Sequence, residues 1–260
     1  LIVHIGGGEA TQGLIDEQVR NMISKAAHIH FTTTKKYAIK LLEIGEHRKR
    51  IFNVGSLSID GILRVRKKSK IQIYNKYGFN KNLPIVILTY HPVTLEFGIS
   101  PSKQIESCFD ALAEFQINLI VTSPNIEVGS KIIKKIIMRN VRKNKNYHYF
   151  DSLGFENYHQ LLQHSKFVIG NSSSGIVEVP YYKIPTINIG IRQKKRLRHL
   201  SIIDVNYDSA AIIKGIKKAN SIKFNKQLKK MIFQFGNGQA VKKIINKLEK
   251  YRLMKDIFLK

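Results

Sequence analysis

The sequence predicts an α/β protein whose parallel sheets are covered by helices on both faces. Short, almost entirely apolar runs recur along the chain, and each is followed by a stretch in which apolar residues repeat at helical spacing. Strands that are apolar throughout are typical of parallel sheets buried on both faces. Their alternation with amphipathic helices therefore indicates parallel sheets, which bind their ligands at the carboxyl ends of the strands.

The apolar runs define the expected strands. These are Ile2–Ile5, Ile29–Thr33, Ile51–Val54, Ile85–Thr89, Leu119–Thr122, Tyr147–Phe150, Phe167–Ile169, Thr186–Ile189 and Ile202–Val205. Helical spacing defines the expected helices, each with its apolar residues on one face. These include Ile15–Ala27, Lys35–Ile44, Ser102–Phe115, Gly129–Asn140, Glu156–Ser165, Gly175–Tyr182 and Gln239–Met254.

The strands fall into two groups, which predicts two domains. The region from Pro84 to Val205 holds enough strands for one doubly wound domain, whereas only three strands precede Gly55. Three strands leave an edge and parts of both faces uncovered, so we expect an incomplete first domain, completed by a preceding segment or by a partner. We place the first domain at residues 1–60, the second at 61–238 and a C-terminal helix at 239–260, with Lys67–Asn82 as a surface connection.

The net charge is +26, from 44 Lys and Arg against 18 Asp and Glu. Such a charge raises the question of nucleic-acid binding. The basic residues are scattered along the chain, however, without a basic tail, a zinc-finger spacing or a basic region followed by heptads. We therefore interpret the charge as a solvated basic surface, with attraction of a small anionic substrate as an alternative, and do not expect nucleic-acid binding as the main function.

Composition also limits the class of protein. A single cysteine, Cys108, excludes an internal disulfide framework and a cysteine-cluster metal site. The longest apolar runs are far shorter than the roughly 18–20 residues that span a bilayer. No secretion signal opens the chain. The sequence therefore predicts a soluble cytoplasmic protein that does not act on a membrane.

The first candidate site follows the expected strand Phe167–Ile169. The chain runs through Gly170 into the serine-rich segment Asn171–Gly175 and then into an expected helix. Small residues there leave the first backbone N–H groups of the helix open, and phosphate is the usual guest of such an end. Glu178 lies about one helical turn further on, where its carboxylate could accept hydrogen bonds from a ribose. The alternative is an ordinary helix cap with additional serines.

Two further candidates follow other expected strands. Arg192 is the first cation after Thr186–Ile189, so it is best placed to bind a phosphate through two hydrogen bonds. The alternative is a solvated basic loop. His91 follows Ile85–Thr89, where it could bond a phosphate or transfer a proton. The alternative is a purely structural histidine.

Carboxylates gather near the start of the chain. Gly6–Gly8 follow the first expected strand, and Glu9, Asp16 and Glu17 come after them. Clustered carboxylates near a phosphate site indicate general acid–base work on a sugar. The alternative is that the glycines only form a loop and that the acidic residues are those favoured at any helix N-terminus. The glycine run lacks the spacing of a dinucleotide fingerprint, so we expect no nicotinamide cofactor.

Seven short segments, taken in order, carry a resemblance to a known family. They are His4–Glu9, Ile15–Glu17 with Arg20, Phe52–Gly55, His91–Thr94, Pro124–Ile126 with Gly129 and Ser130, Gly170–Gly175 with Glu178, and Asn188–Gln193. Together they cover nearly the whole chain and resemble the UDP-N-acetylglucosamine 2-epimerase family. The closest likeness is to its hydrolysing branch, which feeds the synthesis of sialic, legionaminic and related nonulosonic acids.

The resemblance implies a fold, a site and partners. The fold would be two Rossmann-like domains in a GT-B arrangement, with no metal and no cofactor. The implied residues are His91, Ser172, Ser173 and Arg192 for the UDP phosphates, Glu178 for the ribose, Asn125, Ser152 and Leu153 near the uracil, and Asp16, Glu9 and His91 for catalysis. The partners would be a UDP-sugar and further copies of the chain in a homo-oligomer.

The reaction implied by the resemblance has two steps. Anti elimination removes UDP across C1–C2 of UDP-N-acetylglucosamine or UDP-diacetylbacillosamine, and water then adds to give the free 2-epimer. One alternative is a UDP-binding remnant without activity, because Gly6 stands where members of the family often carry Glu or His. Another alternative is a UDP-sugar glycosyltransferase of GT-B fold.

Overall fold

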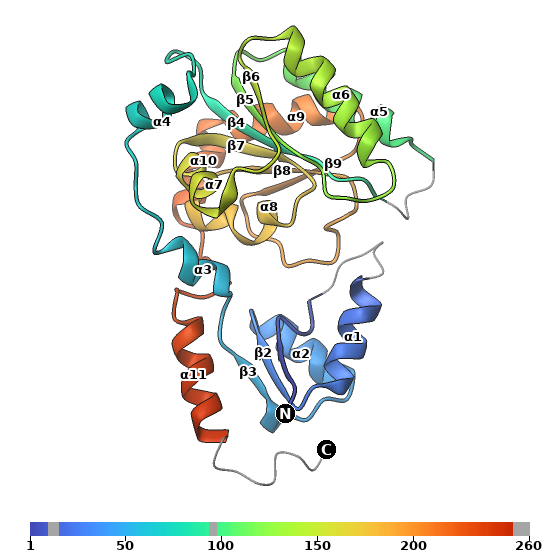
Figure 1. Cartoon of the computed structure of the whole chain (residues 1–260), viewed down its shortest axis with the longest axis vertical. Helices are drawn as coiled ribbons and strands as arrows, with labels where there is room; N and C mark the ends of the chain where they lie inside the picture. The colour runs from blue at the N-terminus through green and yellow to red at the C-terminus, as the bar shows by residue number, and fades with distance from the viewer. Residues whose placement is uncertain (10–15, 94–97, 252–260) are drawn as a thin grey trace. The chain divides into compact units, whose positions relative to one another are not determined.

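The computed structural model describes residues 1–9, 16–93 and 98–251, which fold into two compact units (Figure 1). The first unit comprises Leu1–Arg64, Lys195–Leu197 and the chain from Phe233 onward. The second comprises Val65–Lys194 and Arg198–Ile232. Each unit is built on one parallel sheet, so the predicted fold class of two parallel-sheet α/β domains is confirmed.

The first unit has a three-stranded sheet in the order β1-β2-β3. The strands are β1 (Val3–Ile5), β2 (Ile29–Thr32) and β3 (Ile51–Asn53). The helices of this unit are α1 (Asp16–Ala26), α2 (Lys35–Glu43), the single 3₁₀ turn η1 (Arg48–Arg50), α3 (Leu57–Ile62) and α11 (Ala240–Tyr251). The central strand β2 is buried along its length, and Ile29 and Phe31 pack against Ala240 and Ile244 of α11. Helix α11 thus completes the core of a sheet whose strands come from the opposite end of the chain.

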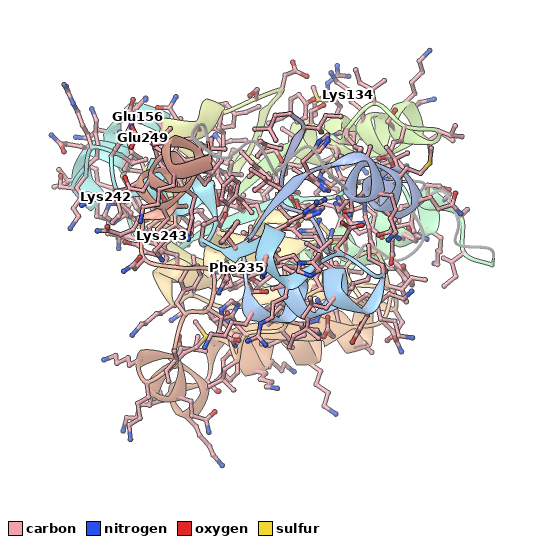
Figure 2. All side chains as sticks on the ribbon, turned by 90° about the horizontal axis from the view of Figure 1, so that it is seen from below. Lys134, Glu156, Phe235, Lys242, Lys243 and Glu249 are labelled. Carbon is pink, nitrogen blue, oxygen red and sulfur yellow. The ribbon has the colours of Figure 1, made fainter. Side chains whose placement is uncertain are left out.

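Helix α11 has one buried and one charged face. Its buried face contributes Ala240 and Ile244, whereas Lys242, Lys243 and Glu249 are exposed (Figure 2). This division follows the helical spacing of apolar residues in the sequence and fixes which side of α11 meets the sheet.

Asp60 of α3 holds the start of α11. Its buried carboxylate accepts hydrogen bonds of 3.0 Å from the backbone N–H groups of Ala240 and Val241. The first N–H groups of a helix have no partner within the helix, so this carboxylate acts as a cap supplied from elsewhere in the chain.

Replacing Asp60 by alanine is expected to lower the free energy of unfolding by about 1–3 kcal/mol, since two N–H groups at the start of α11 lose a carboxylate acceptor. Urea unfolding followed by circular dichroism measures the change. Asp110→Ala, at an exposed position of another helix, is the matched control. Equal stability of the two variants would contradict the capping role.

The second unit has a six-stranded parallel sheet in the order β6-β5-β4-β7-β8-β9. The strands are β4 (Ile85–Thr89), β5 (Asn118–Thr122), β6 (Tyr147–Phe150), β7 (Ser165–Gly170), β8 (Thr186–Ile189) and β9 (Ile202–Val205). The helices are α4 (Lys70–Tyr77), α5 (Pro101–Ala113), α6 (Ser130–Lys143), α7 (Gly154–Leu162), α8 (Ser174–Val177), the 3₁₀ turn η2 (Val179–Tyr182), α9 (Ser209–Asn220) and α10 (Ile222–Lys229).

Helices cover both faces of this sheet. Alternate residues of β4 point to opposite faces: Val86 and Leu88 belong to the core under α5, α6, α9 and α10, whereas Ile85 and Ile87 belong to the core under α4 and α7. A strand buried on both faces must be apolar at every position. That requirement explains why the strands are visible in the sequence as uninterrupted apolar runs.

The prediction of a surface connection at Lys67–Asn82 was wrong. This segment contains α4, which buries Ile73 and Tyr74 in the core of the second unit. A capping box between Ser69 and Gln72 starts the helix, and Gly78 ends it in the left-handed conformation. Only two apolar side chains face inward in this short helix, which is too few for a clear periodic pattern.

Other helices differ from expectation in number and length. The expected helix Gly175–Tyr182 is divided into α8 and η2 near Pro180, which has no N–H group for a continuous helical ladder. The structure adds α3, α9 and α10 to the expected helices. The domain boundaries at residues 60 and 238 stay predictions. Over the part of the chain that the structure describes, no helix is long and apolar enough to cross a membrane.

Candidate functional site

The strand order of the second unit has a switch point between β4 and β7. The chain runs from β4 outward to β5 and β6, and then returns to β7 on the other side of β4. In open α/β sheets, the loops on the two sides of such a switch point leave in opposite directions, and the crevice at the carboxyl ends of these strands binds the ligand. His91 comes just after β4, and Asn171 comes directly after β7.

Asn171 joins the two sides of this crevice. Its buried side chain accepts a hydrogen bond from the His91 N–H (2.7 Å) and donates one to the His91 carbonyl (2.8 Å). Its own N–H donates to the Thr89 carbonyl at 3.1 Å. Gly170 makes this approach possible, because it has φ +130° and a Cβ there would lie 1.9 Å from the Thr89 carbonyl oxygen.

Arg192 and Gln193 reach the same point from the end of β8. The Asn171 carbonyl accepts hydrogen bonds from Arg192 Nη1 (3.3 Å) and Gln193 Nε2 (2.9 Å). Both side chains come from buried residues, so the guanidinium is held in place rather than free in solvent. A positive charge is thereby fixed beside the crevice, as the binding of a phosphate requires.

The loop after β5 supplies the third side of the site. The Asn125 N–H donates to His91 Nδ1 at 3.1 Å, and the Asn125 side chain donates to the Glu127 carboxylate. Glu127 also lies 3.8 Å from Arg192 Nη2. Among the described residues, the buried atoms Asn125 Oδ1 and Glu127 Oε2 have no hydrogen-bond partner. Buried polar atoms of this kind are uncommon and point to a site built for a polar ligand.

His91 is neutral near pH 7. Burial, together with the positive charge of Arg192, lowers its pKa from 6.5 to about 4, although an interaction with the Asn125 side chain acts in the opposite direction. Because Nδ1 accepts a hydrogen bond, the single proton of the neutral ring lies on Nε2. The ring therefore offers one N–H donor to a phosphate oxygen without carrying a charge.

The titration of His91 is a direct check of this environment. By NMR, its ring is expected to stay neutral down to about pH 5, and UDP is expected to raise its pKa because phosphate stabilises the charged ring. The folded pKa lies below the unfolded value, so the contribution of His91 to stability falls as the pH drops from 6.5 toward 4. His91→Gln identifies the resonance. If the pKa of His91 in the folded chain without UDP were near 6.5, that value would contradict the buried position of the ring beside Arg192.

Three serines, Ser172 to Ser174, follow Asn171 directly. Ser172 and Ser173 are half-buried, Ser172 Oγ accepts a hydrogen bond from the Ser174 N–H (3.4 Å), and the Ser173 side chain makes no capping hydrogen bond to α8. The hydroxyl of Ser174 donates to Glu178 at 2.7 Å. Burial raises the pKa of Glu178, while this hydrogen bond lowers it. The segment thus places two serines and one carboxylate beside the crevice.

Ser152 and Leu153 lie at the end of the outer strand β6. Ser152 is exposed and its hydroxyl accepts a hydrogen bond from the Gly154 N–H at 3.2 Å, whereas Leu153 is buried. Within the described residues, neither makes a hydrogen bond to the group formed by His91, Asn125 and Arg192. Their place at the uracil stays a prediction.

The predicted catalytic carboxylates belong to the first unit. Glu9 follows β1 and accepts a hydrogen bond from Thr33 Oγ1 at 3.1 Å, and its carboxylate lies 3.6 Å from Arg196 Nη1. Asp16 is the first residue of α1, and its side chain lies outside the described residues. The acid–base roles of Glu9 and Asp16 stay predictions.

Three members of the site have no assigned role in the sequence prediction: Asn171, Glu127 and Gln193. Asn171 and Gln193 stand inside segments that the sequence singles out, directly after Gly170 and Arg192. Glu127 gives no local signal, because its role depends on a loop that returns to Arg192 from another strand. In the part of the chain that the structure describes, no group of three or more His, Cys, Asp or Glu could hold a metal ion.

The chain is similar to known proteins in both sequence and structure. The model of the UDP-N-acetylglucosamine 2-epimerase family matches residues 1–249. A GDP/UDP-N,N'-diacetylbacillosamine 2-epimerase (hydrolyzing) from Campylobacter jejuni is 38% identical over 205 residues, which cover 78% of this chain and 53% of that protein. A UDP-N,N'-diacetylbacillosamine 2-epimerase (hydrolyzing) from Legionella pneumophila is 31% identical over 256 residues, or 98% of this chain and 64% of that protein.

A solved structure gives an independent comparison of the fold. The UDP-GlcNAc 2-epimerase from Neisseria meningitidis, bound to UDP-GlcNAc, matches with a TM-score of 0.81 at 16% identity, over 95% of this chain and 69% of that one. The chain thus spans roughly half to two thirds of the length of the relatives it matches. The residues that the family model matches, 1–249, run through both units. The chain belongs to the UDP-N-acetylglucosamine 2-epimerase family.

Proposed function

We propose that this chain binds a UDP-sugar with its diphosphate at the switch point between β4 and β7. The observation that carries the proposal is a connected network: Asn171 is hydrogen-bonded to His91 and Arg192, and Asn125 is hydrogen-bonded to the His91 ring. A fixed guanidinium and a neutral ring N–H suit a diphosphate, because both donate hydrogen bonds to oxygens that carry negative charge. The serines after β7 supply further donors on the same side.

We further propose that the reaction is that of a hydrolysing 2-epimerase. Anti elimination of UDP leaves a 2-acetamidoglycal, and addition of water gives the free 2-epimer. The names of the Campylobacter and Legionella relatives support this outcome and favour UDP-diacetylbacillosamine over UDP-N-acetylglucosamine as the substrate. The product would then be a precursor of sialic or legionaminic acids, made in the cytoplasm by a homo-oligomer.

Each side chain has a physical task in this proposal. The leaving UDP gains negative charge as the C1–O bond breaks, and Arg192 with the His91 N–H stabilises that charge. Ser172 and Ser173 hold the phosphates, and Glu178 holds the ribose. The proton at C2 is weakly acidic, so a positioned carboxylate must remove it, and Asp16 with Glu9 supplies this group.

The test is incubation of the chain with each UDP-sugar in D₂O, followed by ³¹P and ¹H NMR. We expect free UDP together with a free sugar that is inverted and deuterated at C2. Asp16→Asn should abolish this release while keeping UDP affinity within about twofold, because it removes a base and not a phosphate ligand. UDP binding without release would favour the inactive remnant. Sugar transferred with C2 unchanged would favour a glycosyltransferase.

A further inference from the structure

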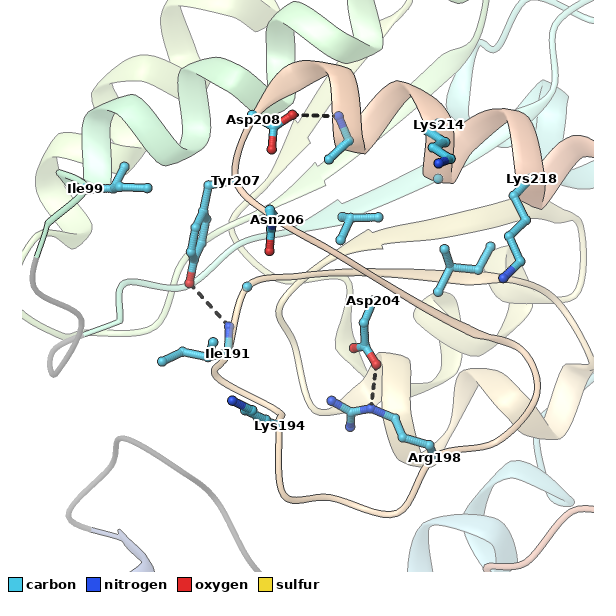
Figure 3. A pocket seen from close by; sticks show the side chains of 15 residues that line it. Ile99, Ile191, Lys194, Arg198, Asp204, Asn206, Tyr207, Asp208, Lys214 and Lys218 are labelled. Atoms are coloured by element: carbon cyan, nitrogen blue, oxygen red, sulfur yellow. Dashed lines mark hydrogen bonds and ion pairs between the residues drawn. The ribbon is translucent and has the colours of Figure 1, made fainter.

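The second unit contains another pocket, formed by residues that the UDP site does not use. It has a volume of about 1070 Å³ and lies between the end of β8, the outer strand β9 and helix α9 (Figure 3). This volume is at the upper end of the usual range for small-molecule sites, roughly 300–1,000 Å³. The pocket is therefore large enough for a metabolite rather than a single ion.

The carboxylates of this pocket are already occupied. Asp204 accepts hydrogen bonds from Arg198 Nε (3.0 Å) and Asn188 Nδ2 (2.6 Å). Asp208 accepts from the Ala211 N–H at 2.8 Å and so caps α9 (Figure 3). Arg198 balances the charge of Asp204, whereas Asp208 keeps its own charge while it caps the N-terminus of α9.

Three ammonium groups at the pocket have no carboxylate partner among the described residues. Lys194 extends from the loop after β8, and Lys214 and Lys218 extend from successive turns of α9 (Figure 3). All three are exposed, and the ion pairs of the described residues include none of them. The nearest aromatic contact is Lys218 over the Phe224 ring, 5.3 Å from its centroid. These lysines give the pocket a local positive potential that the protein itself does not neutralise.

Apolar groups form the rest of the lining. Ile99, Ile191 and Ile203 line the pocket, and the Tyr207 ring stands at one end, with its hydroxyl accepting a hydrogen bond from the Ile191 N–H at 3.3 Å (Figure 3). An apolar lining with a few charged groups is typical of sites for organic ligands. The combination fits a molecule that has both a charged and an uncharged part.

We propose that this pocket is a second ligand site, which binds a small phosphorylated molecule carrying at least two negative charges. Lys194, Lys214 and Lys218 bind the phosphate oxygens, and the isoleucines and Tyr207 contact the uncharged part. The proposal goes beyond UDP-sugar binding and does not depend on it. The two sites share the loop from Gly190 to Arg198, where Arg198 Nη1 donates to the Gln193 carbonyl at 2.6 Å.

Calorimetric titration with inorganic tripolyphosphate tests the proposal. The titration is made on the Arg192→Ala variant, at constant ionic strength, so that binding at the His91 site is weakened without adding a second phosphorylated ligand. We expect saturable binding that weakens about tenfold or more in the double variant Lys214→Gln/Lys218→Gln, because two charged hydrogen bonds are lost. Lys217→Gln is the matched control, since Lys217 is exposed on the same helix but does not line the pocket.

Each contrary outcome has a distinct meaning. If Lys217→Gln weakened tripolyphosphate binding equally, the anion would be attracted to the whole basic surface. That result would contradict a binding site in the pocket. Loss of tripolyphosphate binding in the Arg192→Ala variant would assign the binding to the His91 site and would also contradict binding in the pocket. Citrate binding as tightly as tripolyphosphate would overturn the preference for phosphate. Failure of UDP itself to bind contradicts the proposed function alone, since the tripolyphosphate titration still reports on the lysines.

Discussion

Replacing Arg192 by alanine is expected to weaken UDP binding by about 1.5–3 kcal/mol, or roughly 10- to 150-fold. The guanidinium is buried and held by the Asn171 carbonyl, so it is already oriented when the diphosphate arrives. Such pre-organisation lowers the entropic cost of each hydrogen bond. Arg192→Lys should recover only part of the affinity, because an ammonium group cannot donate in the planar fork of a guanidinium.

Isothermal titration calorimetry with UDP measures this effect. Lys166→Ala is the matched control, because its replacement removes the same charge. Lys166 is exposed near the start of β7, at the amino ends of the strands and away from the proposed site. The control should bind UDP nearly as the unaltered chain does. If both variants lose affinity equally, long-range charge and not a site at Arg192 would explain the attraction of UDP.

Replacing Asn171 by alanine is expected to have the second large effect, on stability as well as on binding. The variant leaves the N–H and the carbonyl of His91 without the partners that Asn171 provides. Unpaired groups of this kind cost about 1–3 kcal/mol each, so we expect a loss of about 2–4 kcal/mol in the free energy of unfolding. UDP affinity should fall too, because the position of His91 depends on this bridge.

Urea unfolding and UDP titration of the same variant separate the two effects. Asn82→Ala, at an exposed position before β4, serves as the control and should change neither quantity. The account would be contradicted if Asn171→Ala kept both its stability and its UDP affinity. Asn171→Asp keeps the acceptor for the His91 N–H but loses the donor to the His91 carbonyl. Its free energy of unfolding should therefore lie between that of Asn171→Ala and that of the unaltered chain.

Much of the fold could be predicted because its sheets are buried on both faces. The bounds of β4, β6, β8 and β9 agree with the expected strands. In β4 the apolar run coincides with burial of Ile85–Leu88. There is also a physical reason why some helices of the structure are not among those expected from the sequence. Helix α9 carries Gly215 in its middle, which looks like a breaker, yet a Cβ there would lie 2.8 Å from Val205 Cγ1. Close helix–sheet packing, which no local pattern reveals, selects this glycine.

The candidate site was predictable only in part. His91, Asn125 and Arg192 each follow a strand end, and parallel strands bring their carboxyl ends to one edge. The bridge through Asn171 could not be derived, because it depends on the strand order that places β7 beside β4. The same holds for Glu127, which meets Arg192 only across two loops. Sequence shows which residues stand at the edge, whereas the topology decides which of them touch.

The most direct test of the UDP site is amide shift mapping. UDP is titrated into the ¹⁵N-labelled chain, and changes in the amide signals are followed residue by residue. The account predicts saturable changes concentrated at residues 90–91, 125–127, 171–174 and 190–193, at the carboxyl ends of β4, β5, β7 and β8. Changes absent from these loops, or confined to the opposite edge of the sheet, would contradict a UDP site at the β4–β7 switch point.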